Sequence, residues 1–302
     1  MCIIAAKYFN NIGWVLAKNR DQDYVSEVTF KDEKDRKVGE IFTLYDHDTK
    51  YQEGMNYKGL VIITTSLTPS LLGETNDKDG ENINKALKMS SPDEAAAFLV
   101  KKKMTGYIFC ATPSKLVLVE AAKTDNGKGE YQSTTRVVPK TEIVVRTNHG
   151  VDLPWAGFQH GVNDQQDIWA KSSQMRKRQA EHSVKNSKSA EEMLDAMSRR
   201  MTADLQYNQF RVENKPRQMR TIFQWALVPS KHMVYVRPIQ CKMEVDVSRE
   251  MISIDVMDNE SIKDIYGSKI KHFSKIKSHD NGRIIKTVQT EEFKTFKEFY
   301  SL

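Results

Sequence analysis

The chain has 302 residues, of which 39% are hydrophobic, so it can bury the core of one large domain or of two small ones. No apolar run reaches the eighteen residues of a membrane-spanning helix, and the N-terminus lacks the basic and apolar regions of a signal peptide. Three widely spaced cysteines predict neither a disulfide framework nor a zinc site, so we expect a cytoplasmic protein.

The formal net charge of +6 is concentrated in two basic stretches, 171–182 and 269–277. Acidic residues are nearly as numerous as basic ones, 40 against 46, and they are interspersed with them. Neither stretch carries a motif that reads nucleic acid. We therefore interpret both stretches as solvated basic faces and do not expect nucleic-acid binding.

The N-terminal residues predict a β-hairpin. Cys2 opens an apolar strand over residues 2–8, turn residues follow at 10–13, and a second strand begins at Trp14. A short turn brings the end of the second strand back beside the start of the first. The residues that follow the second strand, Lys18 and Asp21, should therefore lie close to Cys2.

The remaining elements follow in the order strands, helices, strands. We expect strands at 41–46, 60–67, 107–112, 115–121 and 142–146, a turn at 54–59, and polar loops at 76–82 and 125–129. Helices are expected at 84–89, 92–103 (capped by Ser91), 167–178 and 190–202, and strands again at 218–228, 233–238, 240–245 and 251–255. This order favours one layered α+β domain over residues 1–302, with a Lys-rich C-terminal extension from about 260.

Cys2 is the first candidate for chemistry. Removal of Met1 would place a thiol and a free α-amine on the same residue. An α-amine titrates near neutrality, at roughly 7.7–8.0, so it can take the thiol proton without help from a histidine. Many chains carry a cysteine at position 2 by chance, so this interpretation depends on the residues downstream.

Three downstream segments supply the groups that such a nucleophile needs. Near Cys2, the carboxylate of Asp21 can orient the amine, and the cation of Lys18 favours a thiolate. Asn148 follows a strand end, where its amide can donate to a developing oxyanion. Arg176 adds a cation on a predicted helix. Taken singly, each is more often a turn or surface residue, and only their combination indicates a site.

In this order the segments resemble the linear-amide hydrolases of the N-terminal-nucleophile superfamily, which include choloylglycine hydrolases, penicillin V acylases and acyl-CoA:6-aminopenicillanic acid acyltransferase-like proteins. The matching pieces span residues 1–180. They are Met1-Cys2, Asn19-Arg20-Asp21, residues 54–60, Arg146-Thr147-Asn148-His149-Gly150, and Ser172-Ser173 with Arg176. The resemblance implies a four-layer α/β/β/α sandwich of two antiparallel sheets.

The resemblance also implies a role for each matching residue. Cys2 is the nucleophile and, through its amine, the base; Asp21 holds the amine; Asn148 donates to the oxyanion; Arg176 steadies the nucleophile site. Two positions depart from the family pattern. Lys18 stands where choloylglycine hydrolases have an arginine, which keeps the charge but loses the guanidinium fork. Ser66 stands where many members have a second oxyanion asparagine.

The implied reaction is hydrolysis of a linear amide through a thioester, or transfer of its acyl group to another amine, without a metal or cofactor. We assign Ser66, His149, Trp155 and Phe158 to the substrate side, with His149 as structural support and not as a general base. Specificity is expected from loops at 22–53, 68–82 and 151–167. The substrate would be a small-molecule acyl amide of unspecified structure, and a homodimer or homotetramer stays open.

Two other functions stay open. A glutamine amidotransferase domain also uses an N-terminal cysteine, but it predicts a glycine directly after that cysteine, where this chain has Ile3. A non-catalytic binding protein on the same scaffold is the second alternative. The unusual residues at two site positions, Lys18 and Ser66, keep that alternative open.

Overall fold

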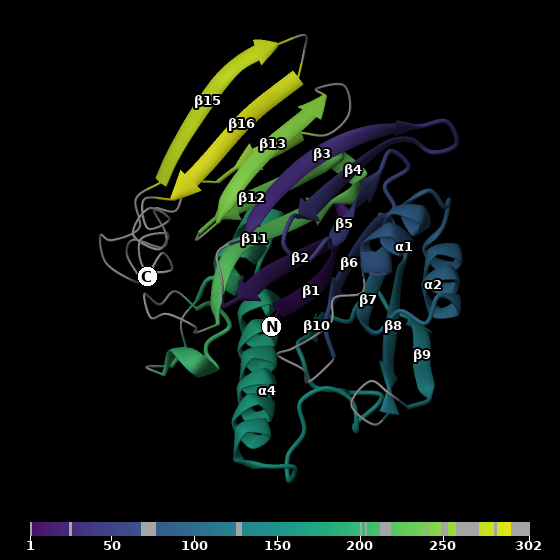
Figure 1. The fold of residues 1–302 in the computed structure, drawn as a ribbon, viewed down its shortest axis with the longest axis vertical. Helices are drawn as coiled ribbons and strands as arrows, with labels where there is room; N and C mark the ends of the chain where they lie inside the picture. Colours follow the sequence, from purple (N-terminus) through teal and green to yellow (C-terminus); the bar gives the residue numbers. More distant parts are fainter. Residues whose placement is uncertain are drawn as a thin grey trace.

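The computed structural model describes residues 2–23, 26–67, 77–124, 129–199, 201–202, 204–211, 219–239, 241–248, 253–257, 272–280 and 283–290. These residues form two sheets with helices on their outer faces (Figure 1). The smaller sheet contains β1 (Cys2–Phe9), β2 (Gly13–Gln22), β10 (Val144–Arg146), β11 (Arg220–Val228), β12 (Met233–Pro238) and β14 (Ser253–Val256). Its strand order is β10-β1-β2-β11-β12-β14, which places β1 and β2 inside the sheet.

The larger sheet contains β3 (Glu27–Asp35), β4 (Gly39–Asp46), β5 (Gln52–Asn56), β6 (Val61–Thr65), β7 (Gly106–Ala111), β8 (Leu116–Lys123), β9 (Tyr131–Val137), β13 (Lys242–Ser248), β15 (His272–Asp280) and β16 (Arg283–Thr290). Its order is β15-β16-β13-β3-β4-β5-β6-β7-β8-β9. Neighbouring strands run antiparallel in both sheets, except that β13 pairs with β3, and β12 with β14, in parallel. The helices are α1 (Asp77–Leu87), α2 (Pro92–Lys101), α4 (Asp164–Lys185) and α5 (Ala190–Met197), with short 3₁₀ turns η1 (Leu205–Tyr207) and η2 (Pro229–Lys231).

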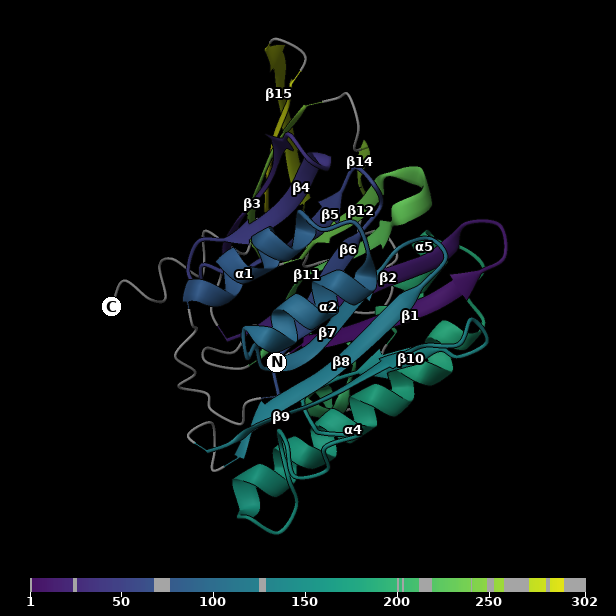
Figure 2. The ribbon, with the colours of Figure 1, turned by 90° about the vertical axis from the view of Figure 1, so that its right-hand side faces the viewer.

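Three clusters of apolar side chains separate four layers. Alternate residues of a strand point to opposite faces, so Ile4 and Leu16 face the larger sheet, whereas Ile3 and Val15 face α4 and α5. A third cluster lies between the larger sheet and the helices α1 and α2, which cover its outer face (Figure 2). The result is a four-layer α/β/β/α sandwich, which confirms the predicted architecture.

The N-terminal hairpin forms as predicted. Cys2 pairs with Arg20 across β1 and β2. Its turn requires glycine at position 13, because φ there is +76° and a Cβ would lie 2.2 Å from the carbonyl oxygen of Pro113. The predicted helix cap is also confirmed, since the Ser91 hydroxyl accepts from the Glu94 N–H at 3.2 Å.

Three predicted loops or turns contain regular structure that was not expected there. The expected loop at 22–53 contains strand β3 in addition to β4, which includes the strand predicted at 41–46; β3 buries Val28 and Phe30, whereas most of its other residues are charged. The expected turn at 54–59 is too early, since β5 continues to Asn56. The expected loop at 76–82 is the first part of α1, which begins at Asp77.

The other predicted elements differ less from those in the structure. Strand β9 is absent from the prediction because its residues are mostly polar and only partly buried. Helix α4 is longer than predicted at both ends, and α5 ends at Met197, where Ser198 caps it. In the tail, β15 and β16 form a hairpin that pairs with β13 at the edge of the larger sheet.

Some predicted segments lie outside the described residues. These are residues 68–76 of an expected specificity loop, 125–128 of a loop tip, and 258–271, which include the start of the second basic stretch. Within the described part of the chain, no helix is both long and apolar enough to cross a membrane.

Candidate functional site

The apolar layer between the two sheets ends in polar side chains around Cys2. Cys2 is 8% exposed and lies at the start of β1, directly opposite Arg20 of β2. Lys18 pairs with Ile4, so it lies diagonally from Cys2 on the same face of the sheet. The strands of the hairpin therefore carry both cations toward the larger sheet, on the face that also carries the cysteine.

Two buried ion pairs join the sheets at this point. Lys18 pairs with Glu53 of β5, and Arg20 pairs with Asp46 at the end of β4. The Glu53 Oε1 atom also accepts from the Thr64 N–H at 3.1 Å. Isolated buried charges are very costly, so each pair compensates charges that the fold brings out of water. Burial alone would raise the pKa of Asp46, but Arg20 and backbone N–H donors hold it below its ordinary value.

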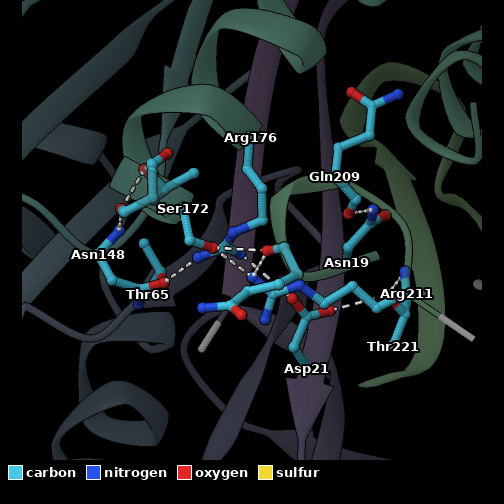
Figure 3. A network of polar contacts seen from close by, with 12 residues as sticks. Asn19, Asp21, Thr65, Asn148, Ser172, Arg176, Gln209, Arg211 and Thr221 are labelled. Carbon is cyan, nitrogen blue, oxygen red and sulfur yellow. Dashed lines mark hydrogen bonds and ion pairs between the residues drawn. The ribbon is translucent and has the colours of Figure 1, made fainter. Parts of the chain in front are cut away.

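On the opposite face of the smaller sheet, Arg176 of α4 joins Asp21 to Asn148 (Figure 3). Its Nη1 atom lies 3.2 Å from Asp21 Oδ2, and its Nη2 atom donates to Asn148 Oδ1 at 3.0 Å. The second carboxylate oxygen of Asp21 accepts from the Thr221 hydroxyl at 2.8 Å. One buried guanidinium thus connects β2, helix α4 and the segment after β10.

The charge of Arg176 depends on its surroundings. Burial and the neighbouring cation of Arg211 lower the pKa of Arg176 to about 9, whereas Asp21 and a thiolate at Cys2 favour the charged form. The guanidinium therefore stays a cation at neutral pH. It is also close enough to Cys2 for the two groups to interact electrostatically, which places Arg176 and the candidate nucleophile in one site.

The Asn148 side chain has a defined orientation. Only its oxygen can accept from Arg176, so its amide nitrogen faces the other way. That nitrogen donates to the Ser66 carbonyl at 2.8 Å and to the Thr65 hydroxyl at 3.3 Å. Both amide hydrogens are thus directed at protein acceptors, and the longer contact to Thr65 is the one that a substrate oxygen could replace most easily.

The neighbour of Asn148, His149, supports this segment. Its Nδ1 atom lies 2.9 Å from the Ser173 hydroxyl and 3.1 Å from the Thr147 hydroxyl, and its carbonyl accepts from Tyr107 at 2.8 Å. Burial, followed by the cations around it, lowers the pKa of His149 to about 4. The imidazole is therefore neutral at pH 7 and contributes hydrogen bonds without a charge.

A buried carboxylate holds the loop that follows. Glu120 of β8 accepts the backbone N–H groups of Val151, Asp152 and Leu153 at 2.8, 2.8 and 3.0 Å. Since this loop continues directly from the Asn148 segment, Glu120 helps to fix the position of the amide. Sequence reasoning did not identify Glu120, because its role depends on a contact between residues more than thirty positions apart.

The structure brings most of the predicted site residues together. Cys2, Lys18, Asp21, Asn148 and Arg176 gather where the hairpin, the Asn148 segment and α4 meet. Ser66 joins them through its carbonyl, while the residue itself is exposed.

The aromatic residues assigned to the substrate side lie in packed surroundings. Trp155 packs partly buried against the core between the sheets. Phe158 is buried, and its ring centroid lies 5.2 Å from that of Trp169. Cys110 belongs to the core beneath α1 and α2. Among the described residues, no group of His, Cys, Asp and Glu side chains is arranged to hold a metal ion.

The fold and the site together define a four-layer sandwich with a cysteine at the start of a central strand, beside a buried arginine network. No protein-family model matches the sequence, and no curated protein matches it. Among solved structures, two variants of the conjugated bile acid hydrolase from Clostridium perfringens align with the chain. Their identities are 12% and 14% and their TM-scores 0.44 and 0.46; the alignments cover 79% and 78% of this chain and 89% of each of those chains. Similarity at this level assigns neither activity nor substrate, so a functional proposal has to come from the residues of the site.

Proposed function

We propose that this chain is a cysteine N-terminal-nucleophile amidohydrolase that cleaves a linear amide bond of a small-molecule acyl amide. The observation that carries the proposal is the buried guanidinium of Arg176, which contacts Asp21 and Asn148 at 3.2 and 3.0 Å beside the free end of β1. A buried arginine needs compensating partners. Here those partners are the two residues that an N-terminal nucleophile requires, a carboxylate for its amine and an amide for the oxyanion.

The proposed reaction begins when removal of Met1 exposes the α-amine of Cys2. The amine takes the thiol proton, and the thiolate attacks the amide carbonyl, which forms a C–S bond and moves an electron pair onto the carbonyl oxygen. Asn148 stabilises that oxyanion. The protonated amine then gives its proton to the leaving nitrogen as the C–N bond breaks. Water hydrolyses the thioester, or a second amine takes the acyl group.

Asp21 is suited to orient the amine. A carboxylate accepts up to about four hydrogen bonds, and its geometry here is fixed by Arg176 on one oxygen and Thr221 on the other. Because Asp21 is fully buried, its carboxylate cannot rotate freely into other arrangements. The α-amine of Cys2, at the neighbouring strand end, would therefore meet a carboxylate whose direction is fixed.

Two alternatives make different predictions. A glutamine amidotransferase would have a glycine after the nucleophile, whereas Ile3 is fully buried against the α4–α5 side of the sheet. A non-catalytic binding protein is favoured by one observation: both amide hydrogens of Asn148 already have acceptors, Ser66 and Thr65. Turnover of any acyl amide that depends on Cys2 would exclude this second alternative.

The test is a screen of acyl amides with release of the free amine as the readout. Wild type, Cys2→Ala and Cys110→Ala are compared, since Cys110 is a buried cysteine in a different layer and serves as the matched control. Cys2→Ala should abolish both turnover and the mass increase of an acylated chain, while Cys110→Ala should retain both. Equal turnover in Cys2→Ala would refute the proposed nucleophile.

A further inference from the structure

Tyr51 lies at the same end of the inter-sheet layer as Cys2, immediately before β5. Its ring contacts both cations of the hairpin, with Lys18 Nζ 5.2 Å and the Arg20 guanidinium 5.6 Å from the ring centroid. Arg20 is also the residue directly opposite Cys2. Tyr51 and Cys2 are therefore neighbours of the same side chain, and they interact electrostatically.

The hydroxyl of Tyr51 is buried, and no acceptor among the described residues meets both the distance and the angle of a hydrogen bond, although the Glu53 carboxylate lies close enough to interact with it. Buried hydroxyls are nearly always hydrogen-bonded, so an exception calls for an explanation. Tyr51 thus holds an O–H donor near the candidate nucleophile, and the Glu53 carboxylate that interacts with it already accepts from Lys18 and from the Thr64 N–H.

This hydroxyl stays protonated under ordinary conditions. Burial, followed by the negative charge of Glu53, raises the pKa of Tyr51 well above its usual value, and a thiolate at Cys2 acts in the same direction. A tyrosine in this state donates a hydrogen bond and does not become a competing anion. The hydroxyl can therefore donate a hydrogen bond at any pH at which the α-amine of Cys2 can act as a base.

The candidate site needs such a donor. The amide hydrogens of Asn148 are directed at Ser66 and Thr65, and Ser66 replaces the second asparagine that the family resemblance implies. We propose that the Tyr51 hydroxyl is a catalytic hydrogen-bond donor, which stabilises the oxyanion that forms when the Cys2 thiolate attacks a carbonyl. This inference rests on the proposed function and adds a residue to it.

The test separates acylation from alkylation of Cys2. The first probe is 4-nitrophenyl acetate: the thiolate attacks the acetyl carbonyl, a C–S bond forms, and the C–O bond breaks as 4-nitrophenolate leaves with the electron pair. This reaction passes through an oxyanion. The second probe is iodoacetamide, in which sulfur displaces iodide at a saturated carbon and no oxyanion forms. Both rates are measured at Cys2 by mass spectrometry, and release of 4-nitrophenolate gives a second measure of the acylation rate.

The variants are Tyr51→Phe and, as a matched control, Tyr131→Phe. The phenylalanine keeps the ring that contacts Lys18 and Arg20 and removes only the hydroxyl. Tyr131 lies on β9, and its hydroxyl donates to the Met104 carbonyl at 3.2 Å, in a different part of the larger sheet. Tyr51→Phe should lower the acylation rate by about 10²–10³-fold, the effect of losing one oxyanion donor, and leave alkylation unchanged. Tyr131→Phe should change neither rate.

Each other outcome overturns the inference. Unchanged acylation in Tyr51→Phe would mean that the ring serves only as a contact surface for the two cations. An equal fall in both rates would mean that Tyr51 acts on the thiol and not on the oxyanion. A lower thermal midpoint than wild type would mean that the hydroxyl has a structural partner. If wild-type Cys2 is not acylated at all, the proposed function fails together with this inference, whereas the first three outcomes leave the proposed function standing.

Discussion

Replacing Arg176 by methionine should destabilise the chain by about 3 kcal/mol. Arg176 and Asp21 are both fully buried, and the substitution leaves Asp21 as a buried carboxylate without its ion-pair partner. Breaking a buried pair in this way typically costs about 3–5 kcal/mol. We expect the lower end of that range, because the Thr221 hydroxyl would still donate to Asp21.

The companion variants turn this expectation into a double-mutant cycle. Asp21→Asn alone leaves the Arg176 cation buried beside Arg211, so it should also cost about 3 kcal/mol. The double variant Arg176→Met/Asp21→Asn removes both charges at once. Its cost should fall short of the sum of the single costs by about 2 kcal/mol or more, which is the coupling expected for residues in direct contact.

The assay is urea unfolding at pH 7, followed by the fluorescence of the buried residues Trp14 and Trp225. For a urea slope of about 3 kcal/mol per molar, the upper end of the range for small proteins, a loss of about 3 kcal/mol lowers the midpoint by about 1 M. Single variants that each cost less than about 1 kcal/mol, with an additive double variant, would refute the view that this ion pair organises the site.

Three further predictions concern single residues. Asn148→Ala should lower kcat by about 10²–10³-fold on any acyl amide that the wild type cleaves, and an unchanged kcat would leave Asn148 with a structural role only. Lys18→Met should slow the reaction of Cys2 with iodoacetamide because it leaves the Glu53 carboxylate uncompensated, whereas Glu53→Gln should accelerate it; a shift of both variants in the same direction would contradict the electrostatic reasoning. The pKa of His149 is lowered to about 4, so between pH 6.5 and 4 the unfolded chain binds the extra proton and wild type should lose stability as the pH falls, by at most about 1.4 kcal/mol per pH unit. His149→Asn should show a weaker pH dependence of the urea midpoint over that window, and an identical dependence would exclude a buried neutral imidazole.

The parts of the fold that depend on local signals could be predicted from the sequence. The hairpin follows from an apolar strand, a turn and a second apolar strand, and the start of α2 follows from the Ser91 cap. Strand β3 could not be predicted in the same way, since most of its residues are charged and only Val28 and Phe30 reveal its buried face. Strand β9 lacks even that alternation, because its place is set by pairing with β8.

The residues of the candidate site could be predicted from the sequence where a single segment contains both the residue and the strand pattern that identifies it. Cys2 begins a strand, Asp21 lies near the end of one and Asn148 follows one, and the order of these segments along the chain indicated their proximity. Tyr51 and Glu53 were not identified, because their positions near Cys2 depend on how one sheet packs on the other. The sequence did contain a signal, because Tyr51 and Glu53 alternate with Met55 as residues on one face of a strand do. We missed this alternation because we expected a turn at 54–59.

The central claim is tested most directly by mapping the reactivity of the three cysteines. The purified chain is treated briefly with limiting iodoacetamide, and its intact mass and the labelled residue are determined. Cys110 and Cys241 are fully buried, and burial raises the pKa of both thiols, whereas Cys2 is slightly exposed at a strand end. Loss of Met1 with rapid, selective labelling of Cys2 is the result that our account predicts. A retained Met1, or labelling of Cys2 no faster than that of Cys110 and Cys241, would contradict it.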